Sequence, residues 1–373
     1  MQMKKIGWIL AAAAVLAGCE NTLEYDFGRN GVRLMASGLL LQQETLHTVS
    51  ISLSDKGTAR LAENAKVTCY VNGTKVAEGR ASASDLPGPG DDGVYGSGDV
   101  ERDFRQLAVR FEADFAPGDE VYLEFEANDG RYKAASPRLT VPGRPSIEAL
   151  DTTRVTETYM EHEAYYWRVR LTVRDRAGED DWYCVFGREM DQGVWSFADG
   201  RPDADTYADF TLYMEDQDDP VMLDGNMPES DEMGLFNLIG DGSFAVFSDR
   251  MFRDRTAELK MTFWPAHPQH VYARMKHLLW ADHGASIADV EEWRIERRLE
   301  MRFGSCSRDT YHYLRALRIV SSPDYMPEIM EPVRIPSNVQ GGIGFVGIIT
   351  ADAASFAIPP IDRDPNIYTQ PVE

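Results

Sequence analysis

Histidine is the residue type in this chain with the clearest metal-binding chemistry, and four of the seven histidines fall between residues 267 and 283. Clustered imidazoles could bind zinc or another transition metal. However, Pro268-Gln269 between the first two is typical of a loop between strands, and His277 would lie about 20 Å further along a strand. His267 and His270 could share an ion, whereas a site that included His277 and His283 would require strands to fold back. We predict no metal site.

Carboxylates form the second group that could do chemistry. Oxygen ligands from flexible loops are what calcium prefers. Neither acidic run has the full EF-hand spacing, which needs a glycine and a terminal glutamate, so we favour solvated acidic loops over a calcium site. The two runs contain Asp203, Asp205 and Asp209, then Glu215, Asp216, Asp218 and Asp219.

Methionines accompany these acids. Met214, Met222, Met227 and Met233 lie in or near the second acidic run. Methionine adapts to irregular surfaces and is frequent where one surface must fit a partner. The alternative is that these side chains pack on the core of their own domain. We single out Met222 and Met227 as possible partner contacts.

Tryptophan offers a third kind of contact, because its ring can stack on a sugar or a small apolar ligand. Beyond residue 18, all six tryptophans lie in the second region of the chain, 146–373. Trp195 lies between turn residues in DQGVWSFADG, which predicts an exposed ring and a possible ligand contact. Large β-sandwich cores also use tryptophan, so packing is the alternative.

No sequence pattern indicates catalysis. The chain has no GxSxG, HExxH or GxxxxGK[ST] pattern. Residues 88–93, GPGDDG, fit GxGxxG, but they lack the flanking strand and helix, and paired aspartates would repel a pyrophosphate. We therefore predict a protein that is not an enzyme and needs no cofactor.

The N-terminus carries a targeting pattern. Lys4 and Lys5 precede a short apolar run that ends in Leu-Ala-Gly-Cys at residues 16–19, as in a secretory signal. The run is too short to span a membrane as a helix. The motif resembles a bacterial lipoprotein box, and this resemblance implies that Cys19 receives lipid and becomes the new N-terminus. A plain signal peptide with a nearby cysteine is the alternative.

The composition limits the possible partners. The formal charge is −23, and removal of residues 1–18 would also remove Lys4 and Lys5. Such a surface repels nucleic acid. With 43% hydrophobic residues the chain can form real cores. Three further cysteines cannot all pair within one chain, so we expect buried free thiols, with one disulfide still possible, at Cys69, Cys184 and Cys306.

Alternation of apolar and polar residues predicts a mainly β protein. Residues 107–115 and 121–127 alternate, and Asn72-Gly73 between two such runs indicates a hairpin. We predict a signal peptide at 1–18, a lipidated tether at 19–31 and an immunoglobulin-like β-sandwich at 32–142. A Pro/Gly-rich segment, 141–145, marks the boundary.

The second region, 146–373, is predicted to be a larger antiparallel β domain, either a sandwich or an open barrel. One α-helix is expected near 307–321, because Tyr313, Ala316, Leu317 and Val320 form an apolar stripe. Ser305 or Ser307 could cap it. The glycine-rich run 341–347 would feed a last strand, since glycine allows positive φ and close backbone approach.

Several segments resemble one family of Bacteroidetes lipoproteins, domain of unknown function 4249. They are residues 116–151, FSDRMF at 247–252, SRDTYHYLRAL at 307–317 and, most specifically, EPVRIPSNVQGGIGFVG at 331–347. With the lipoprotein box, the resemblance covers nearly the whole chain. It carries over no catalytic residue.

The resemblance implies an outer-membrane accessory lipoprotein that assists a TonB-dependent nutrient-uptake receptor by binding the ligand or the receptor. Glu20, Glu24 and Asp26 resemble the acidic export signal of surface-exposed lipoproteins, although a polar tether is the alternative. A structural or adhesive envelope protein remains a second possible function, and an enzyme of unknown type a third.

Overall fold

A computed structural model describes residues 31–55, 58–85, 106–159, 162–178, 180–215, 219–224, 244–321, 325 and 332–363. Cys19, Met227 and the GPGDDG segment lie outside these residues. The prediction of a mainly β protein is confirmed, since the described chain folds into three sheets and two α-helices.

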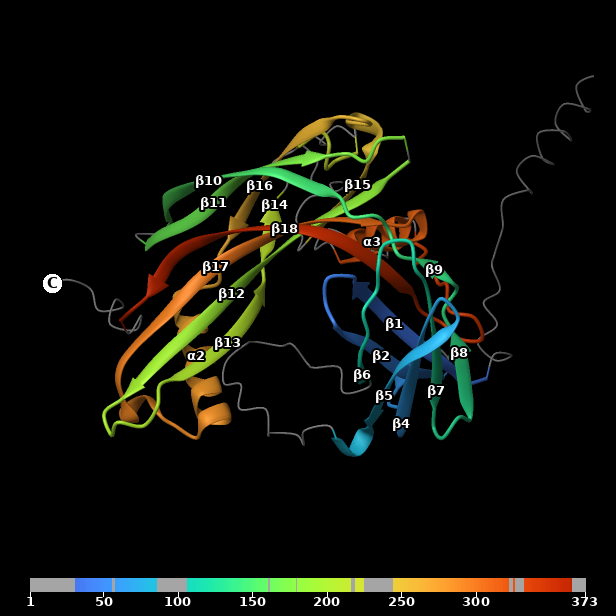
Figure 1. Cartoon of the computed structure of the whole chain (residues 1–373), viewed down its shortest axis with the longest axis horizontal. Coiled ribbons are helices and arrows are strands. Elements are labelled where there is room, and N and C mark those ends of the chain that lie inside the picture. The colour runs from blue at the N-terminus through green and yellow to red at the C-terminus, as the bar shows by residue number, and fades with distance from the viewer. Residues whose placement is uncertain are drawn as a thin grey trace, which may run out of the picture.

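The largest sheet has nine strands and runs through both halves of the molecule (Figure 1). Its main path is β13-β12-β17-β18-β1-β2-β3, with β15 paired to β12 and β6 paired to β2. The bounds are β1 (Arg33–Leu41), β2 (Leu46–Asp55), β3 (Thr58–Arg60), β6 (Leu107–Glu112), β12 (Trp182–Phe197), β13 (Ala204–Thr211), β15 (Phe244–Ser248), β17 (Val290–Cys306) and β18 (Val346–Ile361).

Two smaller sheets and the helices complete the fold. The five-stranded sheet contains β4 (Asn64–Val71), β5 (Thr74–Ser82), β7 (Glu120–Ala127), β8 (Tyr132–Ala135) and β9 (Leu139–Thr140). The four-stranded sheet contains β10 (Ser146–Tyr159), β11 (His162–Arg174), β16 (Thr256–Trp264) and β14 (Tyr213–Glu215). The helices are α2 (Pro268–His283) and α3 (Arg308–Val320), and the short 3₁₀ turns are Ala83–Asp85, Asp249–Met251 and Ile287–Asp289.

The first lobe, built by β1–β9, is a sandwich in which the alternating apolar residues face each other. Leu123 and Phe125 of β7 and Val109 of β6 are all fully buried in one core. The predicted hairpin is present between β4 and β5, where Asn72 and Gly73 have φ of 51° and 79°. Positive φ at both central residues matches the right-handed twist of the paired strands.

The last strand ties the two lobes together. β18 begins parallel to β1, with Gly38 opposite Val346, and continues antiparallel to β17 as far as Ile361. Figure 1 shows it in red, crossing from β1 to the far side of the second lobe. The sequence division assigned all of 146–373 to the second domain, but Val339 and Val346 are buried in the core of the first lobe. Strand pairing over three hundred residues leaves no local sequence pattern, which is why the division differs.

Charged side chains reinforce this junction. Arg302 of β17, largely buried, donates from Nη1 to Glu44 Oε1 (2.9 Å) in the β1–β2 turn and from Nε to Glu300 Oε1 (2.6 Å). Asp352 of β18 accepts from Arg144 Nη2 (2.7 Å) and from the Ile147 backbone N–H (2.9 Å) in the link between the lobes. The lobes therefore share both backbone and side-chain hydrogen bonds.

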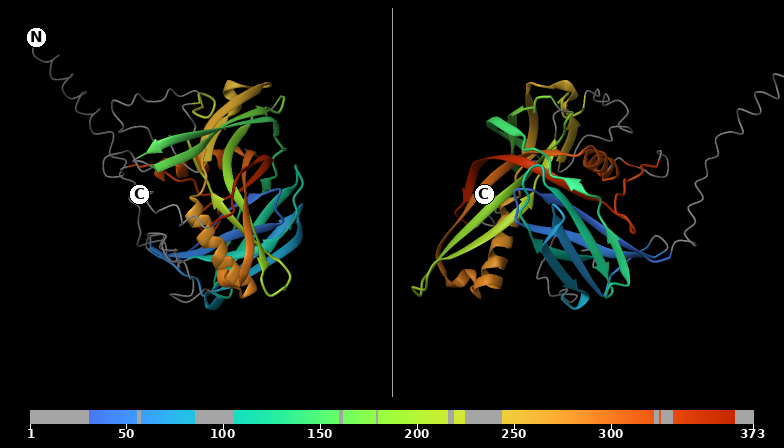
Figure 2. Two further views of the ribbon diagram at one scale, coloured as in Figure 1. Left: turned by 90° about the vertical axis from the view of Figure 1, so that its left-hand side faces the viewer. Right: turned by 45° about the vertical axis from the view of Figure 1, so that its right-hand side comes forward.

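The second lobe packs different elements on the two faces of β12 and β17. On one face, odd-numbered residues of β12 such as Tyr183 and Val185 pack against the four-stranded sheet, and Trp195 packs against α2. On the other face, Cys184 packs against α3. Figure 2 shows the two helices at separate places, α2 beside β13 and α3 near the start of β18.

Helix α2 was not predicted from the sequence, and the interpretation of residues 267–277 as a loop followed by a strand is wrong. Pro268 occupies the first turn, where its missing N–H costs nothing, and His267 Nδ1 accepts the Gln269 N–H (3.3 Å). The helix ends at Gly284, whose φ is 60°. Its buried side chains lie on one face: Val271, Tyr272, Met275 and Leu279.

Helix α3 confirms the helix predicted near 307–321. Ser307 is the cap, because its Oγ accepts the Thr310 N–H (3.2 Å), whereas Ser305 belongs to β17. The predicted stripe is borne out in part: Ala316 is buried, whereas Tyr313, Leu317 and Val320 are half-buried. The other buried residues of the helix include Tyr311, Leu314 and Arg318. Neither helix in the described chain is long and apolar enough to cross a bilayer.

The three cysteines of the described chain are buried free thiols. Burial raises the pKa of Cys69 and that of Cys184 to about 12. These thiols therefore stay protonated and pack as small apolar side chains.

Candidate functional site

Trp195 was predicted to be exposed, and this prediction is wrong. Its side chain is 0% exposed, and its indole N–H donates to Thr206 Oγ1 (3.0 Å) on β13. Gly193 was taken for a turn residue, but it lies in the middle of β12, where a Cβ would come within 2.6 Å of Thr206 Oγ1. The glycine makes room for the indole, so it marks tight packing and not a turn.

Met222 lies in a short turn, residues 219–224, and is also fully buried. Asp219 holds this turn, because its Oδ1 accepts the N–H groups of Val221 (2.9 Å) and Met222 (3.2 Å), and its Oδ2 accepts that of Lys260 (3.0 Å). Burial raises the pKa of Asp219, and these hydrogen bonds oppose the shift. This acid of the predicted acidic loop therefore has a structural role, and Met222 packs on the core of the second lobe.

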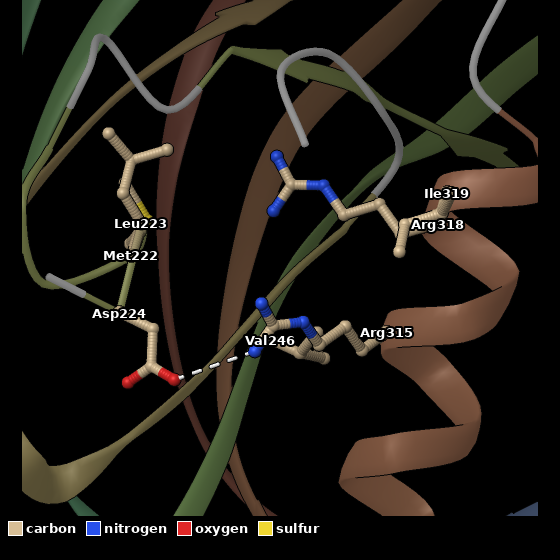
Figure 3. A pocket seen from close by; sticks show the side chains of 7 residues that line it. All are labelled: Met222, Leu223, Asp224, Val246, Arg315, Arg318 and Ile319. Carbon is tan, nitrogen blue, oxygen red and sulfur yellow. Dashed lines mark ion pairs between the residues drawn. The ribbon is translucent and has the colours of Figure 1, made fainter. Parts of the chain in front are cut away.

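A small cavity separates this turn from α3 (Figure 3). Arg315 and Arg318 extend into it from successive turns of the helix, opposite Asp224. The remaining walls are apolar: Met222, Leu223, Val246 and Ile319.

Asp224 is the hydrogen-bonding centre of this cavity. Its Oδ1 accepts the Ser248 N–H (3.1 Å) and hydroxyl (2.5 Å), and its Oδ2 accepts the Tyr311 hydroxyl (2.9 Å). Arg315 Nη1 lies 3.8 Å from Asp224 Oδ2 and donates to the Tyr311 oxygen (2.7 Å). Burial would raise the pKa of Asp224, but these hydrogen bonds outweigh it and the pKa is lowered, so the carboxylate stays ionised.

The cavity has room for little more than one water molecule between its walls. Its two guanidinium groups give it anion-binding chemistry, but it is not a preformed site for a drug-sized ligand. A larger, open groove with a volume of about 480 Å³ lies on the first lobe. Its lining is polar and self-paired, since Lys66 Nζ lies 2.8 Å from Glu126 Oε2.

The four histidines of the predicted cluster are distributed along α2. His267 and His270 are neighbours, with ring centroids 5.7 Å apart, whereas His283 at the other end bonds through Nε2 to the Asp205 carbonyl oxygen (2.9 Å). Burial, followed by His270 and Arg297, lowers the pKa of His267. Among the described residues there is no group of three or more side chains able to hold a metal.

Trp280 on α2 is the tryptophan that the structure exposes, at 64%. The other tryptophans beyond residue 18 are buried or half-buried. Sequence reasoning placed the exposed ring at Trp195 because turn residues flank it, and it did not recognise the helix that carries Trp280. In a helix, Trp280 lies away from the buried positions Met275 and Leu279.

A buried charged cluster was missed altogether. Glu189 and Asp191 on β12 and Arg297 on β17 have side chains that are 0 or 1% exposed. Their i, i+2 spacing on a strand places both acids on one face, and this spacing was the available signal. Acids usually face water, so this spacing alone did not indicate that the two side chains are buried.

Fold and cavities together define a two-lobed β protein with a continuous inter-lobe strand and no recognised catalytic constellation among the described residues. A family model matches residues 20–354, and its description is Domain of unknown function (DUF4249). The chain therefore belongs to this family. The comparison with curated proteins found no match.

Proposed function

We propose that this protein is a lipid-anchored accessory protein of the outer membrane in Bacteroidetes, attached through Cys19, and that it is not an enzyme. Its role is to assist a TonB-dependent receptor by binding the receptor or the nutrient that the receptor takes up. The observation that carries the anchor is Leu-Ala-Gly-Cys at residues 16–19, directly after a short apolar run.

The distance between Cys19 and the fold supports this arrangement. The residues between Cys19 and Arg33, where β1 begins, could span at most about 50 Å if fully extended. The folded lobes would thus stay close to the lipid surface. Their acidic character favours a protein partner over nucleic acid or anionic lipid.

The junction between the lobes supports a binding role for the chain as one unit. Backbone pairing of β18 with β1 and the Arg302–Glu44 hydrogen bond join the lobes. A partner bound to the second lobe would therefore be held in a defined position relative to the first lobe. The described cavities are small or self-paired, which favours a protein surface over an enclosed small ligand. The first lobe would act as a spacer and the second would carry the recognition surface.

Replacing Cys19 by serine is expected to release the protein from membranes. Each buried lipid CH₂ contributes about 0.8 kcal/mol, so losing the acyl chains should lower the detergent-phase fraction by about tenfold or more. Phase partitioning of cell extracts measures this fraction. The matched control Asn21→Ser alters the same tether outside the motif and should behave as wild type. Equal membrane retention of Cys19→Ser and wild type would contradict lipid anchoring.

Capture from crosslinked membranes tests the accessory role. With Cys19 intact, the captured complexes are expected to contain a TonB-dependent receptor, identified by mass spectrometry. Recovery of only copies of this chain would instead support the structural or adhesive function. Failure to recover a receptor under crosslinking would contradict the accessory role.

A further inference from the structure

The buried cluster at the start of α2 combines two acids with one base. Glu189 and Asp191 lie on the same face of β12, and Arg297 of β17 is paired directly opposite Asp191. All three side chains are excluded from solvent. In such a site, unbalanced charge is far more costly than at the surface.

Arg297 uses its hydrogen bonds to hold three elements together. Its Nε donates to Glu189 Oε1 (2.7 Å), its Nη2 donates to Glu189 and to the Ala266 carbonyl oxygen (2.7 Å), and its Nη1 donates to the Tyr165 hydroxyl (3.2 Å). Glu189 Oε2 in turn accepts the Ala266 N–H (2.6 Å). The Arg297–Glu189 pair therefore hydrogen-bonds both the N–H and the carbonyl oxygen of Ala266, which lies between β16 and α2.

Asp191 takes no part in the hydrogen bonds between Arg297, Glu189 and Ala266. Neither of its oxygens has a hydrogen-bond partner within the described chain, and its Oδ1 lies 3.9 Å from Arg297 Nε. With Asp191 neutral, one negative and one positive charge balance. With Asp191 ionised, two carboxylates would compete for one guanidinium, and a small shift of Arg297 toward Asp191 would weaken its bonds to Ala266 and Tyr165.

We propose that Asp191 holds a proton that keeps this junction closed, and that loss of the proton releases the start of α2 and the adjoining end of β11 from the main sheet. The device needs no ligand other than the proton. It does not depend on the proposed accessory role.

The surrounding charges agree with this assignment. Burial raises the pKa of Asp191 to about 8, with Glu189 adding to the shift and Arg297 opposing it. Asp209 on β13 adds a further negative charge. Near the start of α2, His267 has a lowered pKa, so it is neutral where Asp191 titrates.

Tyr165 and Arg154 are the aromatic and cationic neighbours of the buried cluster. Tyr165 of β11 is the acceptor of Arg297, and Arg154 of β10 lies 4.5 Å from the Tyr165 ring centroid. His270 is the remaining titratable group at this end of α2, beside His267. Among the described residues on these elements, Arg297 is the cation nearest to the Asp191 carboxyl.

The direction of the pH effect follows from proton linkage. Opening hydrates Asp191 and returns its pKa to about 3.9, so the open state binds fewer protons than the closed state at intermediate pH. The opening constant should therefore rise by about tenfold per pH unit between about pH 4 and 8 and level off above. The protonated Asp191 carboxyl contributes its whole stabilisation of the closed state below about pH 4, and this contribution is lost as the pH rises through about 8.

Hydrogen exchange of the full mature chain in detergent tests this. Peptides that cover residues 265–284 are compared between wild type and Asp191→Asn at the same pH, which cancels the intrinsic pH dependence of exchange. We expect the wild-type opening constant, relative to the variant, to rise by at least tenfold from pH 6 to pH 8. Glu292→Gln, which removes an exposed acid on β17 that does not act on Asp191, should behave as wild type. If the ratio of the wild-type opening constant to that of Asp191→Asn is the same at every pH, the proposal is wrong.

A second variant and a direct measurement cover the case in which Asp191→Asn does not fold. Glu189→Gln removes the competing acid, so Asp191 should ionise at lower pH and the opening transition should shift down by at least about one pH unit. In wild type labelled with ¹³C aspartate, one carboxyl resonance should titrate above pH 6. If every aspartate titrates below pH 5, the proposal is wrong.

Discussion

Replacement of Arg297 by alanine is expected to destabilise the protein by about 3–5 kcal/mol, because it leaves Glu189 buried without its cation. Arg297 and Glu189 are 1% and 0% exposed, so neither can recover hydration without local opening. The Ala266 carbonyl oxygen also loses its donor. Urea unfolding followed by tryptophan fluorescence measures the change, since Trp195 and Trp293 pack beside α2.

Arg298→Ala is the matched control for this experiment. Arg298 is adjacent in β17 but faces solvent, and its Nη1 donates only to Ser355 Oγ at 3.3 Å. Its loss should cost less than about 0.5 kcal/mol. Adding Glu189→Gln to Arg297→Ala should recover part of the lost stability, because the remaining buried group is then neutral. Equal effects of Arg297→Ala and Arg298→Ala would show that the buried pair does not hold the second lobe.

Gly344→Ala is expected to destabilise the inter-lobe connection by about 2–4 kcal/mol. Gly344 has a φ of 115°, and a Cβ there would overlap the Ala36 carbonyl oxygen on β1. The backbone approaches closely because the Ala36 N–H donates to the Ile343 carbonyl oxygen (2.9 Å) just before β18 begins. Thermal unfolding of the two proteins measures the difference.

Gly118→Ala separates the two causes of this effect. Gly118 has a φ of 90°, but a Cβ there would meet no atom within 4 Å. It should therefore show only the cost of a left-handed alanine, about 1 kcal/mol. If Gly344→Ala costs no more than Gly118→Ala, close contact between β1 and the 339–348 segment is not what joins the lobes.

Local patterns allowed correct prediction of local structure. Alternation at Val121, Leu123 and Phe125 predicted β7, and Asn72-Gly73 predicted the hairpin. Ser307 followed by helical periodicity predicted α3. Each of these signals depends on neighbours within one strand or one turn, so no knowledge of tertiary packing is needed.

Segments with ambiguous local signals were misinterpreted. Pro268 both begins helices and interrupts strands, and beside two histidines it was taken for a loop. Gly193 is a common turn residue, but here it makes space for Trp195. In both cases the deciding factor is what the segment packs against, which the sequence does not state.

Non-local features could not be predicted at all. The pairing of β18 with β1 joins residues about three hundred positions apart. The burial of Asp191 depends on Arg297, Ala266 and α2 meeting over one patch of β12. The resemblance nevertheless pointed to residues 331–347, and the described part of that segment, 332–347, leads from the core of the first lobe into β18.

The lipid anchor is the central claim of this account, because the proposed location and partner both depend on it. Mass spectrometry of the N-terminal tryptic peptide from purified membranes tests it most directly. Cleavage after Arg29 should release residues 19–29 with acyl groups on Cys19. A peptide that continues upstream to Ile6, or an unmodified Cys19, would contradict lipid attachment.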